Sequence, residues 1–220
     1  MPAFPSLFRR CRLPLLGLCL GLIAGAASAA KPVAASADPL QSAMAGEYAL
    51  QAGKLDEAAR WYLEAARAAG GDAVVAERAT RVALLAKNDV SATAALKLWR
   101  ARAEPSSAMR SAEATLALRR KNEAVAFREL QALLRGQGGD KDAKKDGWRH
   151  ALLALDAGSG DPKLTGRLLG RLIDAIPDQL EAWLAFGEFS QQLQRDDLAE
   201  RIVSRVIAKF PDEPAVALLH

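Results

Sequence analysis

The sequence predicts an all-α protein built from repeated helix pairs, and two observations lead to this fold class. Alanine and leucine supply most of the apolar residues, and only 5% of the 220 residues are aromatic, so intrinsic propensity favours helix over strand. Pro177 and Pro211 lie 34 residues apart, and each ends an apolar helical run. A fixed period of about 20–50 residues is typical of repeat architectures.

The first 29 residues are typical of a secretory signal peptide. Three arginines precede the apolar run LPLLGLCLGLIAGA, and the small residues Ala27 and Ala29 follow it. We expect cleavage near Ala29, a short linker over residues 30–38, and a periplasmic or secreted product. The alternative is an uncleaved membrane anchor, because residues 13–30 form an uncharged run near the lower length limit for crossing a bilayer.

Loss of this segment would change the chemistry of the chain. Both cysteines, Cys11 and Cys19, lie within it, so the mature chain would have no disulfide, thiolate metal site or cysteine nucleophile. Its three arginines would leave as well, so that 27 of the 30 basic residues remain against 26 acidic ones. A net charge this close to zero does not favour binding to nucleic acid.

The stretch between the two prolines fits two helices of about a dozen residues, joined by a turn at QRDD. Gly187 should let another helix approach the first of them, and alanine and valine line the inner face of the second. This stretch resembles the tetratricopeptide repeat, whose signature has Trp, Leu, Gly and Tyr, then Ala, an aromatic and Ala, and a closing Pro. The matching residues are Trp183, Phe186, Gly187, Ala199 and Pro211, and the departures are Ser190, Val203 and Val206.

A 34-residue spacing also fits the first half of the chain, over residues 39–135, where it predicts three repeats. The corresponding residues are Gly46, Gly53, Ala58, Tyr62 and Ala65 in the first repeat, Thr80, Lys87, Ala92, Leu96 and Trp99 in the second, and Ala114, Lys121, Ala126, Leu130 and Leu133 in the third. Lysine therefore replaces glycine at two of the three turns.

The register then slips by five residues across the polar stretch 136–147, which we expect to be a solvated loop. Residues 148–213 form two further repeats. In the first of these, Leu153 takes the glycine place and Thr165 the alanine place, so this helix pair should pack less closely. We also expect Gly187→Leu to destabilise the fold more than Gly138→Leu, because Gly138 lies in the loop.

Residues 214–220 begin a sixth first helix or form a frayed end. An uncovered end would leave Ile202, Val206 and Phe210 partly exposed, and a solenoid needs a polar cap there. We therefore expect the chain to be the front part of a longer repeat protein, or a partner or a second copy to cover this end.

No catalytic site emerges from the sequence, and we expect no enzyme, cofactor or metal. The two histidines, His150 and His220, have no local carboxylate or cysteine set around them. The acidic group at residues 196–200 fits a helix N-terminus, where carboxylates complement the helix dipole. Glycine-rich material at residues 157–166 lacks the Gly-Lys-Ser/Thr ending of a phosphate-binding loop.

The resemblance implies a right-handed solenoid of antiparallel helix pairs, a superhelix whose concave groove binds a protein or an extended peptide. It implies no nucleic-acid partner, and membrane association only through an uncleaved signal. The alternative is a docking arm of a longer envelope enzyme or secretion machine, and a purely structural assembly subunit is a third reading. The implied groove residues are Glu47, Leu50, Glu77, Arg81, Leu84, Thr115, Arg119, His150, Leu184, Glu188 and Gln191.

Overall fold

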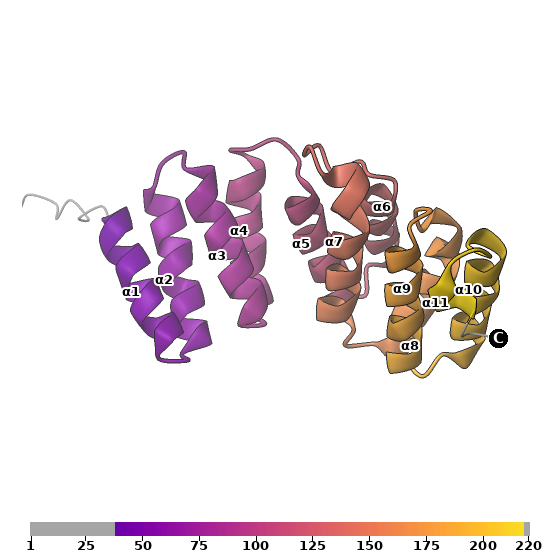
Figure 1. Cartoon of the computed structure of the whole chain (residues 1–220). Coiled ribbons are helices and arrows are strands. Elements are labelled where there is room, and N and C mark those ends of the chain that lie inside the picture. Colours follow the sequence, from indigo (N-terminus) through magenta and orange to yellow (C-terminus); the bar gives the residue numbers. More distant parts are fainter. Residues whose placement is uncertain (1–37, 218–220) are drawn as a thin grey trace, which may run out of the picture. The chain divides into compact units, whose positions relative to one another are not determined.

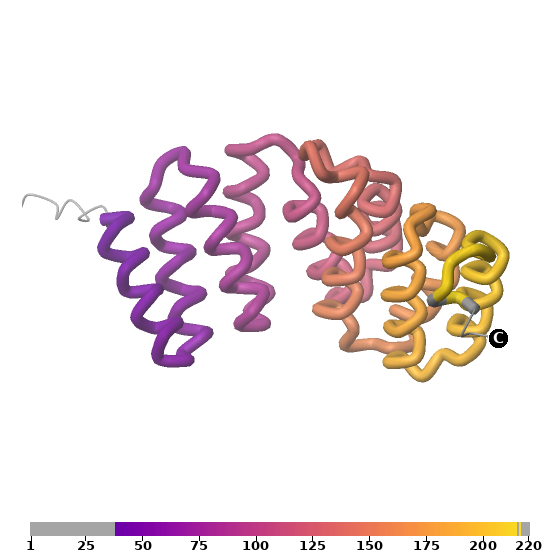
Figure 2. The backbone as a smooth tube through the Cα atoms, viewed as in Figure 1, coloured from indigo at the N-terminus to yellow at the C-terminus, as the bar shows by residue number. Residues whose placement is uncertain are grey.

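The computed structural model describes residues 38–217. The expected signal peptide, its cleavage site near Ala29, both cysteines, residues 30–37 of the linker and residues 218–220 lie outside the described residues. Within residues 38–217 every regular element is helical (Figure 1). Neighbouring helices run down and up in succession along the chain (Figure 2). The prediction of an all-α array of helix pairs is therefore confirmed.

The described helices form five consecutive pairs, each joined by a short turn. Helices α3 and α4 pack against each other, and α3 also packs against α2 of the preceding pair. The bounds are α1 (Pro39–Gln51) and α2 (Leu55–Ala68), α3 (Ala73–Leu85) and α4 (Asp89–Arg100), α5 (Ser107–Arg119) and α6 (Glu123–Leu134), α7 (Ala143–Gly158) and α8 (Pro162–Leu172) with the 3-10 turn η1 (Ile173–Ala175), α9 (Leu180–Gln192) and α10 (Asp196–Lys209), and then α11 (Pro214–Ala217).

Backbone conformation at the turns follows the 34-residue spacing. Gly53, Lys87 and Lys121 stand at the same point of the first three pairs and have φ of 72°, 54° and 57°, and Gln194 in the fifth pair has 55°. Only glycine reaches this left-handed region without steric cost. The fold therefore imposes the same turn on all four residues, whether or not the residue is glycine.

Two apolar clusters fill the interior, and α5 contributes to both. Met109, Ala112 and Leu116 belong to the cluster that reaches back to α1. Other α5 residues, including Ala114 and Leu118, belong to the cluster that extends to α11. Helix α4 contacts α5 more sparsely than it contacts α3, and the two apolar clusters separate at α5.

The fourth pair departs from the predicted register. Trp148 and Trp183 occupy equivalent buried positions 35 residues apart, so α7 is displaced by one residue relative to the 34-residue spacing. Leu153 is 61% exposed and does not take the glycine place, which falls to Leu152. Helix α7 packs mainly on α5 and α6, and α8 is not among its main contacts, so the two helices of this pair pack less closely than the other pairs.

The polar stretch at 136–147 is shorter and better packed than predicted. Helix α7 starts at Ala143, and Asp140 accepts hydrogen bonds from the Ser107 amide at 2.7 Å and hydroxyl at 2.8 Å. A Cβ added to Gly138 would lie 1.9 Å from Ser107 Oγ, whereas one added to Gly187 would meet only Ile202 Cγ2, at 3.5 Å. These contacts contradict the reason for the expected order of the two glycine substitutions, because Gly138 is the more closely packed of the two glycines.

The C-terminal end of the array is also better covered than expected. Ile202 and Val206 are each 1% exposed and share a cluster with Val216 of α11, while Phe210 is half-buried. The expectation that Ile202 and Val206 are partly exposed is wrong, because the short α11 packs back onto the fifth pair.

Candidate interaction surface

All of the predicted groove residues lie on the first helix of a pair, but the structure distributes them among separate hollows. Three hollows carry most of the exposed apolar and charged side chains on these helices. We call them the N-terminal hollow, between α1 and α3, the turn hollow, at the ends of α3, α5 and α7, and the C-terminal hollow, between α7 and α9.

The N-terminal hollow has a volume of about 560 Å³ and an apolar rim. Leu40, Met44 and Tyr48 of α1 are 66%, 50% and 68% exposed, and Val74 of α3 is 72% exposed. Sequence reasoning placed none of these four residues in the groove. The three residues of α1 could have been found from their spacing of four, which puts three large apolar side chains on one helix face.

A polar group forms the floor of the N-terminal hollow. Glu47 accepts hydrogen bonds from the Tyr62 hydroxyl and, at 2.9 Å, from Arg78 Nη2, and the Arg78 guanidinium lies 5.6 Å from the centre of the Tyr62 ring. The Tyr62 hydrogen bond, aided by Arg78, lowers the pKa of Glu47. Burial and the Glu47 hydrogen bond raise the pKa of Tyr62. Glu47 is therefore ionised and already engaged within the fold.

Arg81, the other predicted residue in the N-terminal hollow, stands at its rim. Its side chain is 62% exposed and pairs with Glu77, one turn away on the same helix, at 3.3 Å. Such an exposed i,i+4 pair contributes little free energy. Arg81 is thus available to a carboxylate that approaches α3.

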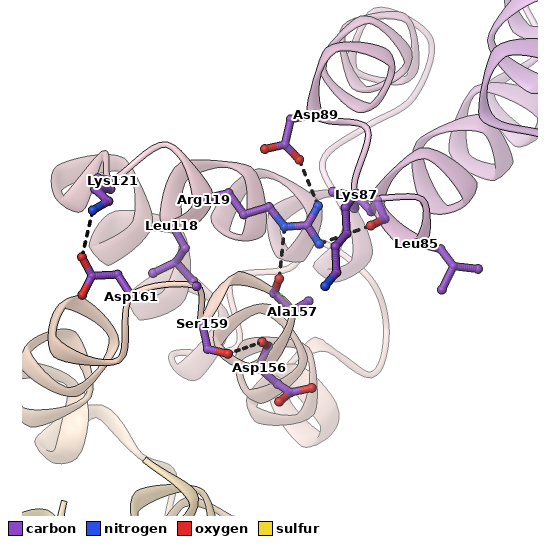
Figure 3. A pocket seen from close by; sticks show the side chains of 12 residues that line it. Leu85, Lys87, Asp89, Leu118, Arg119, Lys121, Asp156, Ala157, Ser159 and Asp161 are labelled. Atoms are coloured by element: carbon purple, nitrogen blue, oxygen red, sulfur yellow. Dashed lines mark hydrogen bonds and ion pairs between the residues drawn. The ribbon is translucent and has the colours of Figure 1, made fainter. Parts of the chain in front are cut away.

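The turn hollow, of about 840 Å³, is organised around Arg119 (Figure 3). The guanidinium donates to Asp89 Oδ1 at 2.9 Å, to the Ala157 carbonyl at 3.1 Å and to the Leu84 carbonyl at 3.2 Å. Its side chain is only 15% exposed. Arg119 therefore joins three helix pairs, and its guanidinium is already engaged within the fold.

A second cation of the turn hollow, Lys121, is also engaged within the fold, because it pairs with Asp161 at 3.2 Å (Figure 3). Both carboxylates and cations line this hollow. The mixture favours no single class of charged ligand.

The C-terminal hollow, of about 620 Å³, lies between α7 and α9 and contains Glu188 of the predicted set. Leu153, which is 61% exposed, stands on its rim, and the buried Trp148 and Phe189 contribute to its wall. The Trp148 indole donates to Gln179 Oε1 at 3.1 Å, which fixes the ring against the start of α9.

Of the other predicted groove residues, one is buried, one lines the turn hollow, and the rest lie outside the three hollows. Thr115 is 3% exposed, and its hydroxyl donates to the Ser111 carbonyl at 2.9 Å, so its prediction as a groove residue is wrong. Leu84 lines the turn hollow. The half-buried residues outside the hollows are Leu50, Glu77 and His150, and the exposed ones are Leu184 and Gln191.

Within residues 38–217 the structure gathers no group of histidine, cysteine, aspartate or glutamate that could hold a metal ion. Nor is any described helix both long and apolar enough to cross a membrane.

A comparison with known families agrees with helix pairs in the C-terminal part of the chain. Residues 157–220 match the family model described as tetratricopeptide repeat. A crystal structure of MamA protein is similar with 15% sequence identity and a TM-score of 0.46, over 78% of this chain and 91% of that one. No curated protein sequence matches the chain.

Proposed function

We propose that the chain is a tetratricopeptide-repeat scaffold without catalytic activity that binds other proteins through its first helices, since residues 157–220 match the tetratricopeptide-repeat family model and residues 38–217 form an array of helix pairs. The observation that carries this proposal is the pair of hollows between first helices, at α1 and α3 and at α7 and α9. Exposed apolar side chains gathered in a concave site with a few charged groups are typical of protein-binding surfaces.

A capture experiment tests this proposal. The mature chain, residues 30–220, is immobilised and exposed to an extract of the source cells. Met44→Asp and Leu153→Asp place a carboxylate in the two apolar hollows, and Val90→Asp is the matched control, because Val90 is 82% exposed on the second helix α4. We expect the wild type and the control to retain proteins that the Met44→Asp, Leu153→Asp double variant loses. Equal retention by all variants would contradict a role for the first helices.

We further propose that the scaffold works outside the cytoplasm after cleavage near Ala29, and that it binds no nucleic acid. Support comes from the order of arginines, apolar run and Ala-x-Ala pattern, and from the nearly balanced charge of the mature chain. Intact-mass analysis of the purified protein tests the cleavage. A mass that includes Met1 would contradict cleavage and favour the alternative, an uncleaved N-terminal membrane anchor.

A docking arm of a longer enzyme or secretion machine is the second proposal for the same surface. The docking arm would use the same hollows. Self-association through the C-terminal end, which the sequence suggests, is a separate proposal. Co-purification of an enzymatic subunit with the captured proteins would favour the docking arm. Sedimentation equilibrium of the mature chain tests self-association.

A further inference from the structure

Helix α1 lacks a neighbour that the equivalent helices have. Tyr48, Val82 and Leu116 stand at the same point of α1, α3 and α5, at intervals of 34 residues, yet Tyr48 is 68% exposed while Val82 and Leu116 are each 4% exposed. Helix α3 packs against α2, and α5 packs against α4. Each of these has the second helix of the preceding pair beside it, whereas among residues 38–217 no helix precedes α1.

The exposed side of α1 is shaped for a helix. Leu40, Met44 and Tyr48 repeat every four residues, so they form a stripe about 12 Å long that runs along the helix axis. Val74 of α3 continues the apolar surface across the N-terminal hollow. A helix laid along α1 would cover this stripe in the way that α2 lies against α3.

Charge at the rim specifies the partner further. Glu47 is already engaged, because it accepts hydrogen bonds from the Tyr62 hydroxyl and from the Arg78 guanidinium. Arg81 is 62% exposed and has its ion pair on its own helix. A partner carboxylate beside the apolar stripe would meet Arg81, whereas a lysine there would meet a like charge.

From these contacts we propose that the N-terminal hollow binds an amphipathic helix of a partner protein, with an acidic residue beside its apolar stripe. This inference rests on the proposed function and names the partner element for one of its two hollows. A second copy of the chain fits less well, because the only acidic residue of its α1, Glu47, is already engaged by Tyr62 and Arg78. It would therefore offer Arg81 no free carboxylate from the stripe.

Fluorescence polarisation with synthetic peptides tests this inference on the whole mature chain. The probe is a labelled helical peptide with leucines at positions i, i+4 and i+8 and a flanking glutamate. Its controls carry a lysine in place of the glutamate, or a central proline that breaks the helix. We expect the glutamate peptide to bind at least about tenfold more tightly than the proline peptide.

Variants of the protein locate the binding. Tyr48→Asp and Met44→Asp, both at exposed positions, should weaken the glutamate peptide about tenfold, a loss of the size expected when an apolar anchor is removed. Arg81→Glu should reverse the preference between the glutamate and lysine peptides. Val90→Asp on the second helix α4, outside the hollows, should leave the affinity unchanged. Urea midpoints equal to that of the wild type show that each variant is folded.

Several outcomes would overturn the inference. Equal binding of the proline peptide, or no binding of the glutamate peptide, would exclude a helical partner. Loss of peptide binding in Leu153→Asp but not in Tyr48→Asp would move the helix site to the C-terminal hollow. Captured proteins without any peptide binding would also overturn the helix proposal. Both results would leave the proposed scaffold function standing. A dimer of the wild type that Tyr48→Asp dissociates would assign the surface to a second copy.

Discussion

Arg119 of α5, the helix at which the two apolar clusters meet, donates a hydrogen bond to Asp89 of α4 at 2.9 Å. The same guanidinium reaches the carbonyls of Leu84 and Ala157. A second bridge, between Arg100 and Glu113 at 3.0 Å, also joins α4 and α5. Polar contacts thus join the second and third helix pairs, whose helices α4 and α5 contact each other more sparsely than α3 and α4 do.

Arg119→Met should therefore lower the stability of the whole array. Methionine keeps an apolar stem but removes three charge-assisted hydrogen bonds from a side chain that is 15% exposed. Because one such bond is worth about 1.5–3 kcal/mol, we expect a loss of at least about 1.5 kcal/mol in urea unfolding. Arg81→Met is the control, since Arg81 has only an exposed pair on its own helix. Equal midpoints for the two variants would show that the bridge contributes nothing.

Gly147→Ala should be much more harmful than Gly187→Ala. An added Cβ at residue 147 would lie 2.2 Å from the Leu133 carbonyl oxygen, which belongs to the backbone, whereas at residue 187 it would make ordinary contact with Ile202 at 3.5 Å. We expect a cost of about 1–3 kcal/mol from overpacking at residue 147. At residue 187 the higher helix propensity of alanine should give a gain of up to about 1 kcal/mol. Thermal unfolding of both variants checks the order.

Lys87→Gly should stabilise the protein, because Lys87 has a φ of 54° that costs an ordinary residue about 1–2 kcal/mol. Part of this gain is offset by the larger entropy of glycine in the unfolded chain, so we expect a net gain of up to about 1 kcal/mol. The reverse change, Gly53→Ala at the equivalent turn with φ 72°, should destabilise. If both changes shift the urea midpoint in the same direction, the turns are not equivalent.

The contact between Asp140 and Ser107 should make stability depend on pH. Burial would raise the pKa of Asp140, but the hydrogen bonds from the Ser107 amide and hydroxyl outweigh it, so this pKa is lowered. A carboxyl whose pKa is lower in the folded state stabilises the fold above its unfolded value and loses this effect as pH falls through the folded value.

Comparison of wild type with Asp140→Asn checks this sign. We expect the wild type to be the more stable at pH 7, and the difference to shrink below about pH 4, the ordinary value for aspartate. A difference that stays constant from pH 7 to pH 3 would contradict an ionised Asp140 as the cause.

The helix pairs could be predicted because periodic residues determine them locally. The spacing that relates Gly53, Lys87 and Lys121 predicted turns whose φ values agree. The register of the fourth pair could not be predicted in the same way. The displacement of Trp148 depends on how α7 packs on α5 and α6, and this tertiary contact has no signature in the spacing.

The surface was harder to predict than the fold. The resemblance to the tetratricopeptide repeat assigns Arg119 and Thr115 to the groove, yet neighbouring helices engage Arg119 and bury Thr115. Exposure of Tyr48, whose equivalents Val82 and Leu116 are buried, depends on the absence of a helix beside α1 within the described residues. The exposure of a side chain and its hydrogen bonds depend on which helices pack beside it in the fold, and residue type alone does not determine them.

Site-specific photo-crosslinking in the source cells tests the central claim, binding through the first helices, most directly. A photoreactive phenylalanine analogue is placed at Met44 and Leu153 on first helices and, as a control, at Val90 on the second helix α4, where the side chain is 82% exposed. The account predicts crosslinked proteins at the positions of Met44 and Leu153 and none above background at Val90. Crosslinks at Val90 alone, or equal yields at all three positions, would contradict it.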